Sequence, residues 1–164
     1  MRISKAETVS ELKTIEKMAF EIWNQHYTPI IGASQVSYML EKFQSLQAML
    51  IQISEGYEYF LLEMENDPVG YLSTQVRDNR MFLSKFYVLG EHRGKGIGKK
   101  AHEFILSLAV QKGLEGIDLT VNKENHLAIS VYENFGFKRT GAIVMDIGSG
   151  FVMDDYTYSF TIEK

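Results

Sequence analysis

The sequence predicts an α/β fold in which helices flank a mixed β-sheet. Residues 57 to 88 hold β-prone segments separated by short turns, a pattern that predicts an antiparallel meander. A glycine-rich loop, a helical pattern and a further strand from Ile117 to Val121 follow. The order strand, helix, strand predicts a right-handed parallel crossover, so both kinds of pairing are expected in one sheet.

The N-terminal third is expected to be mostly helical after a short strand at Arg2–Lys5. Apolar residues recur at helical spacing in a first helix that ends near Tyr27: Leu12, Ile15, Ala19 and Ile22. Two further helical patterns cover Val36–Phe43 and Leu46–Ile53, either as two helices or as one helix with a break.

The meander is expected to contain strands at Tyr57–Met64, Val69–Val76 and Met81–Val88, with turns at Glu65–Pro68 and Arg77–Arg80. An amphipathic helix through Ala101–Ala109 ends near Gly113, a usual C-terminal residue for a helix. A second helix is expected at Asn125–Asn134, and two closing strands at Phe137–Ile147 and Phe151–Ile162.

Length and composition predict a single domain over residues 1–164. The chain has 164 residues, of which 45% are hydrophobic, and this is enough for one core and too little for two. No linker or repeat interrupts it. The net charge of -4 gives no reason to expect nucleic acid or an anionic membrane as a partner.

Cysteine is absent, which excludes disulfides, thiol nucleophiles and zinc–thiolate sites. The N-terminus lacks an apolar signal-peptide core, and no apolar run approaches the length of a membrane span. These features favour a cytoplasmic protein. The four histidines show no metal-ligand spacing, so no metal is expected.

The glycine-rich loop Arg93–Lys99 is the strongest physical signal for binding. It lies between a predicted strand and a predicted helix, where backbone N–H groups and the helix dipole hold phosphate. The alternative is a flexible turn with solvated basic residues. The spacing excludes a P-loop, and a relaxed dinucleotide fingerprint at Gly96–Ala101 is disfavoured because the candidate acid, Asp118, starts the next strand instead of ending it.

A second group of residues lies on one face of the later helix, with Asn125, Ala128, Ile129 and Tyr132 at spacings of a helical face. That face is able to line a groove. The alternative is that Tyr132 packs in the core and Asn125 only caps the helix.

Together the two motifs resemble the GNAT superfamily of acyl-CoA N-acyltransferases. The phosphate-loop pattern is met by Arg93–Gly98 after the apolar strand Leu83–Val88, and the second motif by Val121–Phe137. The greatest similarity is to bacterial diamine and polyamine N-acetyltransferases, through Trp23–Tyr27 and Gly150–Tyr156. The resemblance implies a mixed, mostly antiparallel sheet of about seven strands, splayed between the fourth and fifth and flanked by helices.

The resemblance further implies acetyl-CoA as cosubstrate and direct attack by an amine on its thioester. The implied coenzyme-binding residues are Phe86, Tyr87, Val88, Arg93, Gly94, Lys95, Gly96, Ile97, Gly98, Lys99, Asn125 and Tyr132. Tyr132 is the implied general acid, because a phenol protonates a departing thiolate while staying neutral at pH 7. The strand Met81–Val88 holds no carboxylate, so a water, His26 or a carboxylate elsewhere is left as the base.

The expected acceptor is a small primary amine or polyamine, with a peptide or protein N-terminus or lysine as the alternative. Candidate acceptor-site residues are Trp23, His26, Tyr27, Asp154 and Asp155. A structural role is the alternative for each of them. A CoA-binding sensor without turnover is a competing hypothesis of another class, and an NAD-dependent oxidoreductase is disfavoured by strand order. A monomer or a homodimer is expected.

Overall fold

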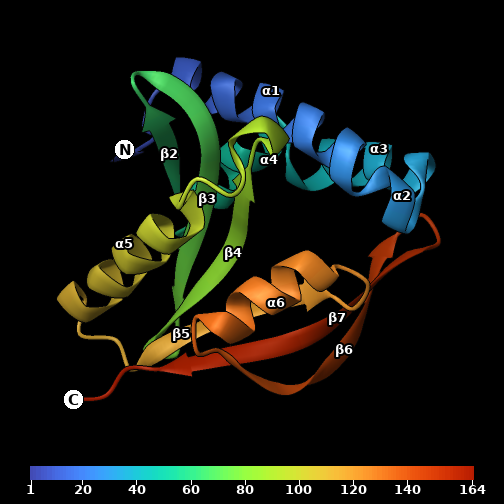
Figure 1. Cartoon of the computed structure of the whole chain (residues 1–164). Helices are drawn as coiled ribbons and strands as arrows, with labels where there is room; N and C mark the ends of the chain where they lie inside the picture. The colour runs from blue at the N-terminus through green and yellow to red at the C-terminus, as the bar shows by residue number, and fades with distance from the viewer. The chain divides into compact units, whose positions relative to one another are not determined.

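The computed structural model describes residues Met1 to Lys164 as an α+β fold with seven strands and flanking helices (Figure 1). The strands are β1 (Arg2–Lys5), β2 (Glu58–Met64), β3 (Asp67–Arg77), β4 (Arg80–Val88), β5 (Gly116–Asn122), β6 (Lys138–Gly148) and β7 (Phe151–Thr161). Their hydrogen-bonded order is β1-β2-β3-β4-β5-β7-β6. The expected mixed sheet of about seven strands is confirmed.

The chain divides into two compact units. Unit 1 contains Met1–Gln75 and Ser84–Ala101, and unit 2 contains Val76–Leu83 and His102–Lys164. The single domain over residues 1–164 stays a prediction.

In unit 1 the predicted antiparallel pairing of the first two meander strands is confirmed. β1 pairs with β2, and β2 pairs with β3. The β2–β3 turn is shorter than predicted: only Glu65 and Asn66 form it, both with positive φ (51° and 69°). A two-residue turn of this kind matches the twist of a hairpin. Pro68 therefore lies inside β3, at a register irregularity where the strand tolerates its missing N–H.

The helices of unit 1 begin with α1 (Val9–His26), α2 (Thr28–Ile31), α3 (Ala33–Phe43) and α4 (Leu46–Ser54). Thr8 caps α1 in a capping box with Glu11, and Ser45 caps α4 by accepting a hydrogen bond from the Ala48 N–H. The capped break at Ser45 explains why residues 33–54 form two helices. α1 contacts α2, α3 and α4 (Figure 1).

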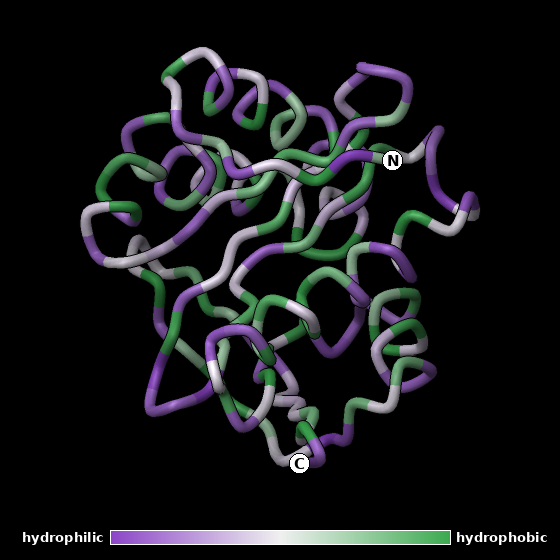
Figure 2. The backbone as a smooth tube through the Cα atoms, turned by 90° about the vertical axis from the view of Figure 1, so that its left-hand side faces the viewer, coloured by the Kyte–Doolittle hydropathy of each residue, from purple (hydrophilic) through white to green (hydrophobic).

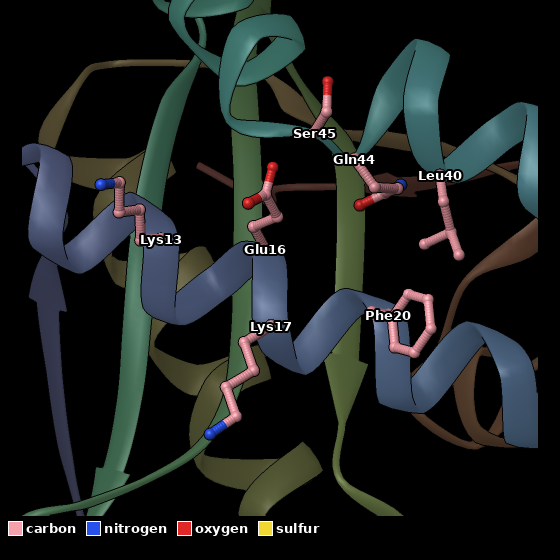
Figure 3. A pocket seen from close by; sticks show the side chains of 7 residues that line it. All are labelled: Lys13, Glu16, Lys17, Phe20, Leu40, Gln44 and Ser45. Atoms are coloured by element: carbon pink, nitrogen blue, oxygen red, sulfur yellow. The ribbon is translucent and has the colours of Figure 1, made fainter.

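A surface pocket lies along α1 where it meets the α3–α4 junction (Figure 3). Its lining residues are Lys13, Glu16, Lys17, Phe20, Leu40, Gln44 and Ser45. The Glu16 carboxylate accepts a hydrogen bond of 2.5 Å from the Leu46 N–H at the first turn of α4. Glu16 therefore joins the side of α1 to the N-terminus of α4, where the helix dipole favours a negative charge.

Unit 1 ends with η1 (Gly90–His92) and the first turns of α5 (Ile97–Gln111), so the predicted succession of strand, loop and helix is confirmed. In unit 2, β5 pairs with β7 and β7 with β6, all antiparallel. β4 and β5 pair in parallel at Met81↔Ile117 and Phe82↔Asp118. The pairing stops there, although β4 continues to Val88 and β5 to Asn122.

The helix α6 (His126–Asn134) follows β5, and Asn125 is its N-cap residue. Hydrophobic and hydrophilic stretches alternate along the chain in Figure 2. In agreement with this pattern, none of the helices has the length and hydrophobicity needed to span a membrane.

Candidate functional site

The loop before α5 has the backbone shape of a phosphate cradle. Gly94 and Gly96 adopt φ of 77° and 78°, a left-handed conformation that side chains rarely adopt. A Cβ at either position would meet no atom within 4 Å. The left-handed backbone conformation, and not steric crowding, therefore favours glycine at these two positions.

Positive charge surrounds this loop. Arg93, Lys95, Lys99 and Lys100 are all exposed, and α5 begins at Ile97 with its dipole directed at the loop. The Arg93 Nε–H donates to the Val88 carbonyl oxygen at 3.2 Å, which ties the loop back to the end of β4. This combination of glycines, helix N-terminus and cations is suited to bind a polyanionic phosphate.

Three of the predicted acceptor and coenzyme residues lie in one aromatic cluster of unit 1. Trp23 and Tyr27 stack with ring centroids 4.3 Å apart, and Tyr87 of β4 contacts both rings at 5.6 and 6.2 Å. Trp23 and Tyr27 are buried, as the core alternative requires. His26 lies beside Tyr27, with ring centroids 4.9 Å apart, at the C-terminus of α1.

Asn125 has the geometry of a helix cap. Its side-chain oxygen accepts a hydrogen bond from the Ala128 N–H at 3.3 Å, and the residue is buried. Tyr132 lies two turns further along α6, with its ring 5.7 Å from that of Phe137. Both residues belong to unit 2.

The two adjacent aspartates of β7 differ sharply in environment. Asp154 is exposed and pairs with Lys123 at 2.7 Å. Asp155 is only 4% exposed, and burial raises its pKa from 3.8 to about 6, with a Thr120 hydrogen bond acting in the opposite direction. Both aspartates were predicted from the sequence as candidate acceptor-site residues, but only Asp155 is a buried carboxylate.

A buried lysine on β4 was missed by sequence reasoning. Lys85 donates hydrogen bonds to Gln52 Oε1 at 3.0 Å and to the Tyr59 hydroxyl at 2.5 Å. Burial lowers its pKa to about 7. The signal was present in the period of two, because Met81 and Leu83 lie four and two residues before Lys85 and are also buried.

The structure brings no group of three or more His, Cys, Asp or Glu side chains together to hold a metal ion. One of the four histidines, His102, stacks on Phe135 with ring centroids 4.6 Å apart, and burial lowers the pKa of His102.

A seven-stranded mixed sheet with a glycine-rich phosphate loop between β4 and α5 defines a class of α+β proteins suited to a phosphate-bearing ligand. The chain belongs to the acetyltransferase (GNAT) family, whose model matches residues 16–137.

The chain is similar to both mammalian and bacterial N-acetyltransferases. "N-acetyltransferase family 8 member 2" of Rattus norvegicus is 27% identical over 128 residues, which are 70% of this chain and 57% of that protein. "Spermine/spermidine N(1)-acetyltransferase" of Bacillus subtilis is 27% identical over 124 residues, which are 69% of this chain and 79% of that protein. The chain spans about half the length of the first relatives it matches (57% and 45%).

Solved structures share the fold at low identity. PaiA N-acetyltransferase from Thermoplasma acidophilum, in complex with coenzyme A, has a TM-score of 0.79 at 19% identity and covers 99% of this chain and 100% of its own. The ribosomal-protein-S18-alanine N-acetyltransferase from Escherichia coli has a TM-score of 0.71 at 20% identity, covering 99% and 94%. These likenesses establish the fold.

Proposed function

We propose that this protein transfers the acetyl group of acetyl-CoA to a primary amine. The observation that carries the proposal is the loop between β4 and α5, where two left-handed glycines, a helix N-terminus and exposed cations form a phosphate cradle in a GNAT fold. The coenzyme supplies an activated acyl carbonyl when bound.

The chain's own groups fit the coenzyme. Backbone N–H groups of Gly94–Lys99 hold the pyrophosphate, and the Arg93, Lys95 and Lys99 side chains neutralise its charge. The backbone of Phe86, Tyr87 and Val88 binds the pantetheine arm; the parallel register of β4 with β5 covers only Met81 and Phe82, at the other end of β4. Asn125 adds a polar contact to this arm.

Tyr132 acts as the general acid. A phenol of pKa about 10 remains protonated at neutral pH and donates to a departing thiolate of pKa near 8.5. The backbone near Val88 supplies the donor for the developing oxyanion. The attack is direct and requires no covalent enzyme intermediate.

The acceptor is a small amine or polyamine. Support comes from the aromatic cluster of Trp23, His26 and Tyr27, which is suited to alkyl ammonium groups, and from the carboxylates Asp154 and Asp155. The similarity to a bacterial spermine/spermidine acetyltransferase favours the same class. A peptide or protein amine is the second candidate, favoured by the fold shared with a ribosomal-protein-alanine N-acetyltransferase. We expect a cytoplasmic protein, monomeric or homodimeric.

The test is release of free CoA thiol from acetyl-CoA with one acceptor at a time: polyamines, monoamines, amino acids and peptides. The product mass identifies the acetylated nitrogen. Turnover confined to polyamines and small amines supports the proposal, and turnover confined to peptides supports the second candidate. Calorimetric binding of acetyl-CoA without turnover on any acceptor would identify a CoA-binding sensor instead.

A further inference from the structure

One face of the β5–β7 pair in unit 2 is a row of polar side chains. Residues directly opposite in an antiparallel pair project to the same face. The register places Asp118 opposite Ser159, Thr120 opposite Thr157, and Asn122 opposite Asp155. We call these six residues the polar face.

The two aspartates of the polar face have different partners. Asp118 receives two hydrogen bonds from the Arg80 guanidinium, at 2.8 and 2.9 Å, and one from the Ser159 hydroxyl at 2.6 Å. Burial by itself raises the pKa of Asp118, but the hydrogen bonds from Arg80 and Ser159, together with the Arg80 charge, outweigh this effect and lower the pKa. Asp118 is therefore a structural carboxylate whose charge is compensated within the fold.

Asp155 has no such compensation. The charged groups that act on it are Asp154, which repels, and Lys123, which attracts but forms its 2.7 Å ion pair with Asp154 instead. Thr120 forms a side-chain hydrogen bond with it, and its cross-strand neighbours are the uncharged Asn122 and Ile143. A buried carboxylate is unfavourable unless a cation or donors accompany it. Asp155 thus retains an unfavourable environment that the fold does not relieve.

The position of Asp155 also connects it to the residues proposed for chemistry. Asn122, opposite Asp155, is the last residue of β5. The Lys123 N–H, at the start of the loop that leads to Asn125 and α6, donates to the Asp154 carbonyl at 3.1 Å. Asp155, on β7, therefore lies beside the carboxyl end of β5, a strand that pairs in parallel with β4 and leads into a helix, and ligands of open sheets commonly bind at such an end.

We propose that Asp155 is the general base, which receives the acceptor's ammonium group and removes one proton from it. The inference rests on the proposed function and supplies the base that β4 lacks. The ammonium group of the bound acceptor supplies the positive charge that the fold does not place beside Asp155. An alkyl ammonium group fits this residue whether it belongs to a small amine or polyamine or to a peptide or protein. A base whose pKa lies close to the working pH is also more effective than an ordinary surface aspartate.

The alkyl ammonium group of the acceptor carries three protons on its nitrogen. Asp155 takes the first proton, which frees the nitrogen lone pair to attack the thioester carbonyl. The C–N bond forms, the C–S bond breaks, and Tyr132 protonates the departing sulfur. The nitrogen loses its second proton to restore the Tyr132 phenol, and the third remains on the amide. Asp155 releases its proton to solvent before the next turnover.

The test compares the pH profiles of wild type, Asp155→Asn and Asp67→Asn with an alkyl amine acceptor. Asparagine keeps the size of the side chain and removes the base. We expect kcat of Asp155→Asn to fall by about 10²- to 10³-fold, the usual contribution of a general base. The KM for acetyl-CoA should be unchanged, and the acidic limb of the wild-type profile, with its midpoint near pH 6, should disappear. Asp67→Asn, which changes an exposed aspartate at the start of β3, should keep that limb.

An arylamine acceptor that is already unprotonated at neutral pH distinguishes a base from a binding group. If Asp155 is the base, Asp155→Asn should lose far less activity on the arylamine than on the alkyl amine. A variant that raises only the KM for the alkyl amine and keeps the acidic limb would overturn the inference while leaving acetyl transfer intact. Absence of wild-type turnover on all acceptors would instead overturn the proposed function.

A readout without coenzyme tests the environment of Asp155 itself. The folded-state pKa of about 6 lies above the unfolded value of 3.8, so the folded state binds the proton more tightly. Stability of the wild type should therefore fall as pH rises from about 4 to about 6, and part of that fall should vanish in Asp155→Asn. The same pH dependence in both proteins would show that Asp155 is not an uncompensated carboxylate and would overturn the inference.

Discussion

The Lys85 ammonium on β4 donates a hydrogen bond to the backbone carbonyl oxygen of Phe43, the last residue of α3. Gln52 of α4 donates to the same carbonyl at 3.1 Å. Helix C-termini attract cations, so this contact favours charged Lys85 while burial favours the neutral form. The cluster joins β4 to the α3–α4 junction within unit 1.

Lys85 should make stability depend on pH in the alkaline range. Its pKa is lowered from 10.5 to about 7 by burial, so between these values the unfolded chain binds the proton and the folded chain does not. The free energy of unfolding should therefore rise from pH 7 to 10, by roughly 3 kcal/mol. Urea unfolding of wild type and Lys85→Met at pH 7 and pH 10 measures this rise, which the variant should lose. The exposed Lys17→Met is the control, and an equal rise in both variants would contradict the assignment.

The phosphate loop should depend on its left-handed glycines. Gly96→Ala places a side chain at φ 78° and should weaken acetyl-CoA binding by about tenfold or more, because the strained backbone no longer directs its N–H groups at the phosphates. Gly56→Ala, at φ 96° after α4, applies similar strain outside the loop and should leave affinity unchanged. Isothermal calorimetry checks both; equal loss of affinity in the two variants would argue against a phosphate-binding role.

Gly116 should be intolerant of a side chain for a different reason. A Cβ there would collide with the Phe160 carbonyl oxygen and the Arg80 guanidinium. Gly116→Ala should lower the free energy of unfolding by about 2 kcal/mol, the usual range for overpacking. Gly141→Ala, whose Cβ would meet only the Thr157 hydroxyl at 3.4 Å, should cost much less. Urea denaturation compares them, and similar stability of the two variants would contradict the packing described.

Glu16 should stabilise α4 from a distance of thirty residues in the sequence. Because its carboxylate accepts from the Leu46 N–H, Glu16→Ala should destabilise the protein by about 1 kcal/mol, as loss of a helix cap does. Lys17→Ala, on the same helix and lining the same pocket, is the matched control (Figure 3). Thermal unfolding measures both, and no difference between them would exclude the capping role.

Much of the fold could be predicted because its signals are local. Period-two and period-3.6 patterns predicted all seven strands and the helices α1, α3, α4, α5 and α6 within a few residues, and the glycine spacing predicted the loop before α5. The short helix α2 (Thr28–Ile31) was not predicted. The β2–β3 turn was predicted too long because Pro68 was placed in the turn before the strand at Val69, whereas a bulge accommodates Pro68 inside β3.

The site could be predicted less fully, because burial and pairing come from distant segments. Spacing alone does not indicate that Lys85 meets Phe43, Gln52 and Tyr59, or that Lys123 pairs with Asp154 and leaves Asp155 without a cation. These contacts arise only once strands and helices far apart in the sequence pack together.

Acetyl transfer with Tyr132 as the general acid is tested most directly by measuring CoA thiol release by wild type and Tyr132→Phe, together with the affinity of each for acetyl-CoA. Tyr38→Phe is the control for loss of a phenol elsewhere. We expect kcat of Tyr132→Phe to fall by about 10²-fold or more at unchanged affinity. Full activity of Tyr132→Phe, or no thiol release by the wild type with any amine, would contradict it.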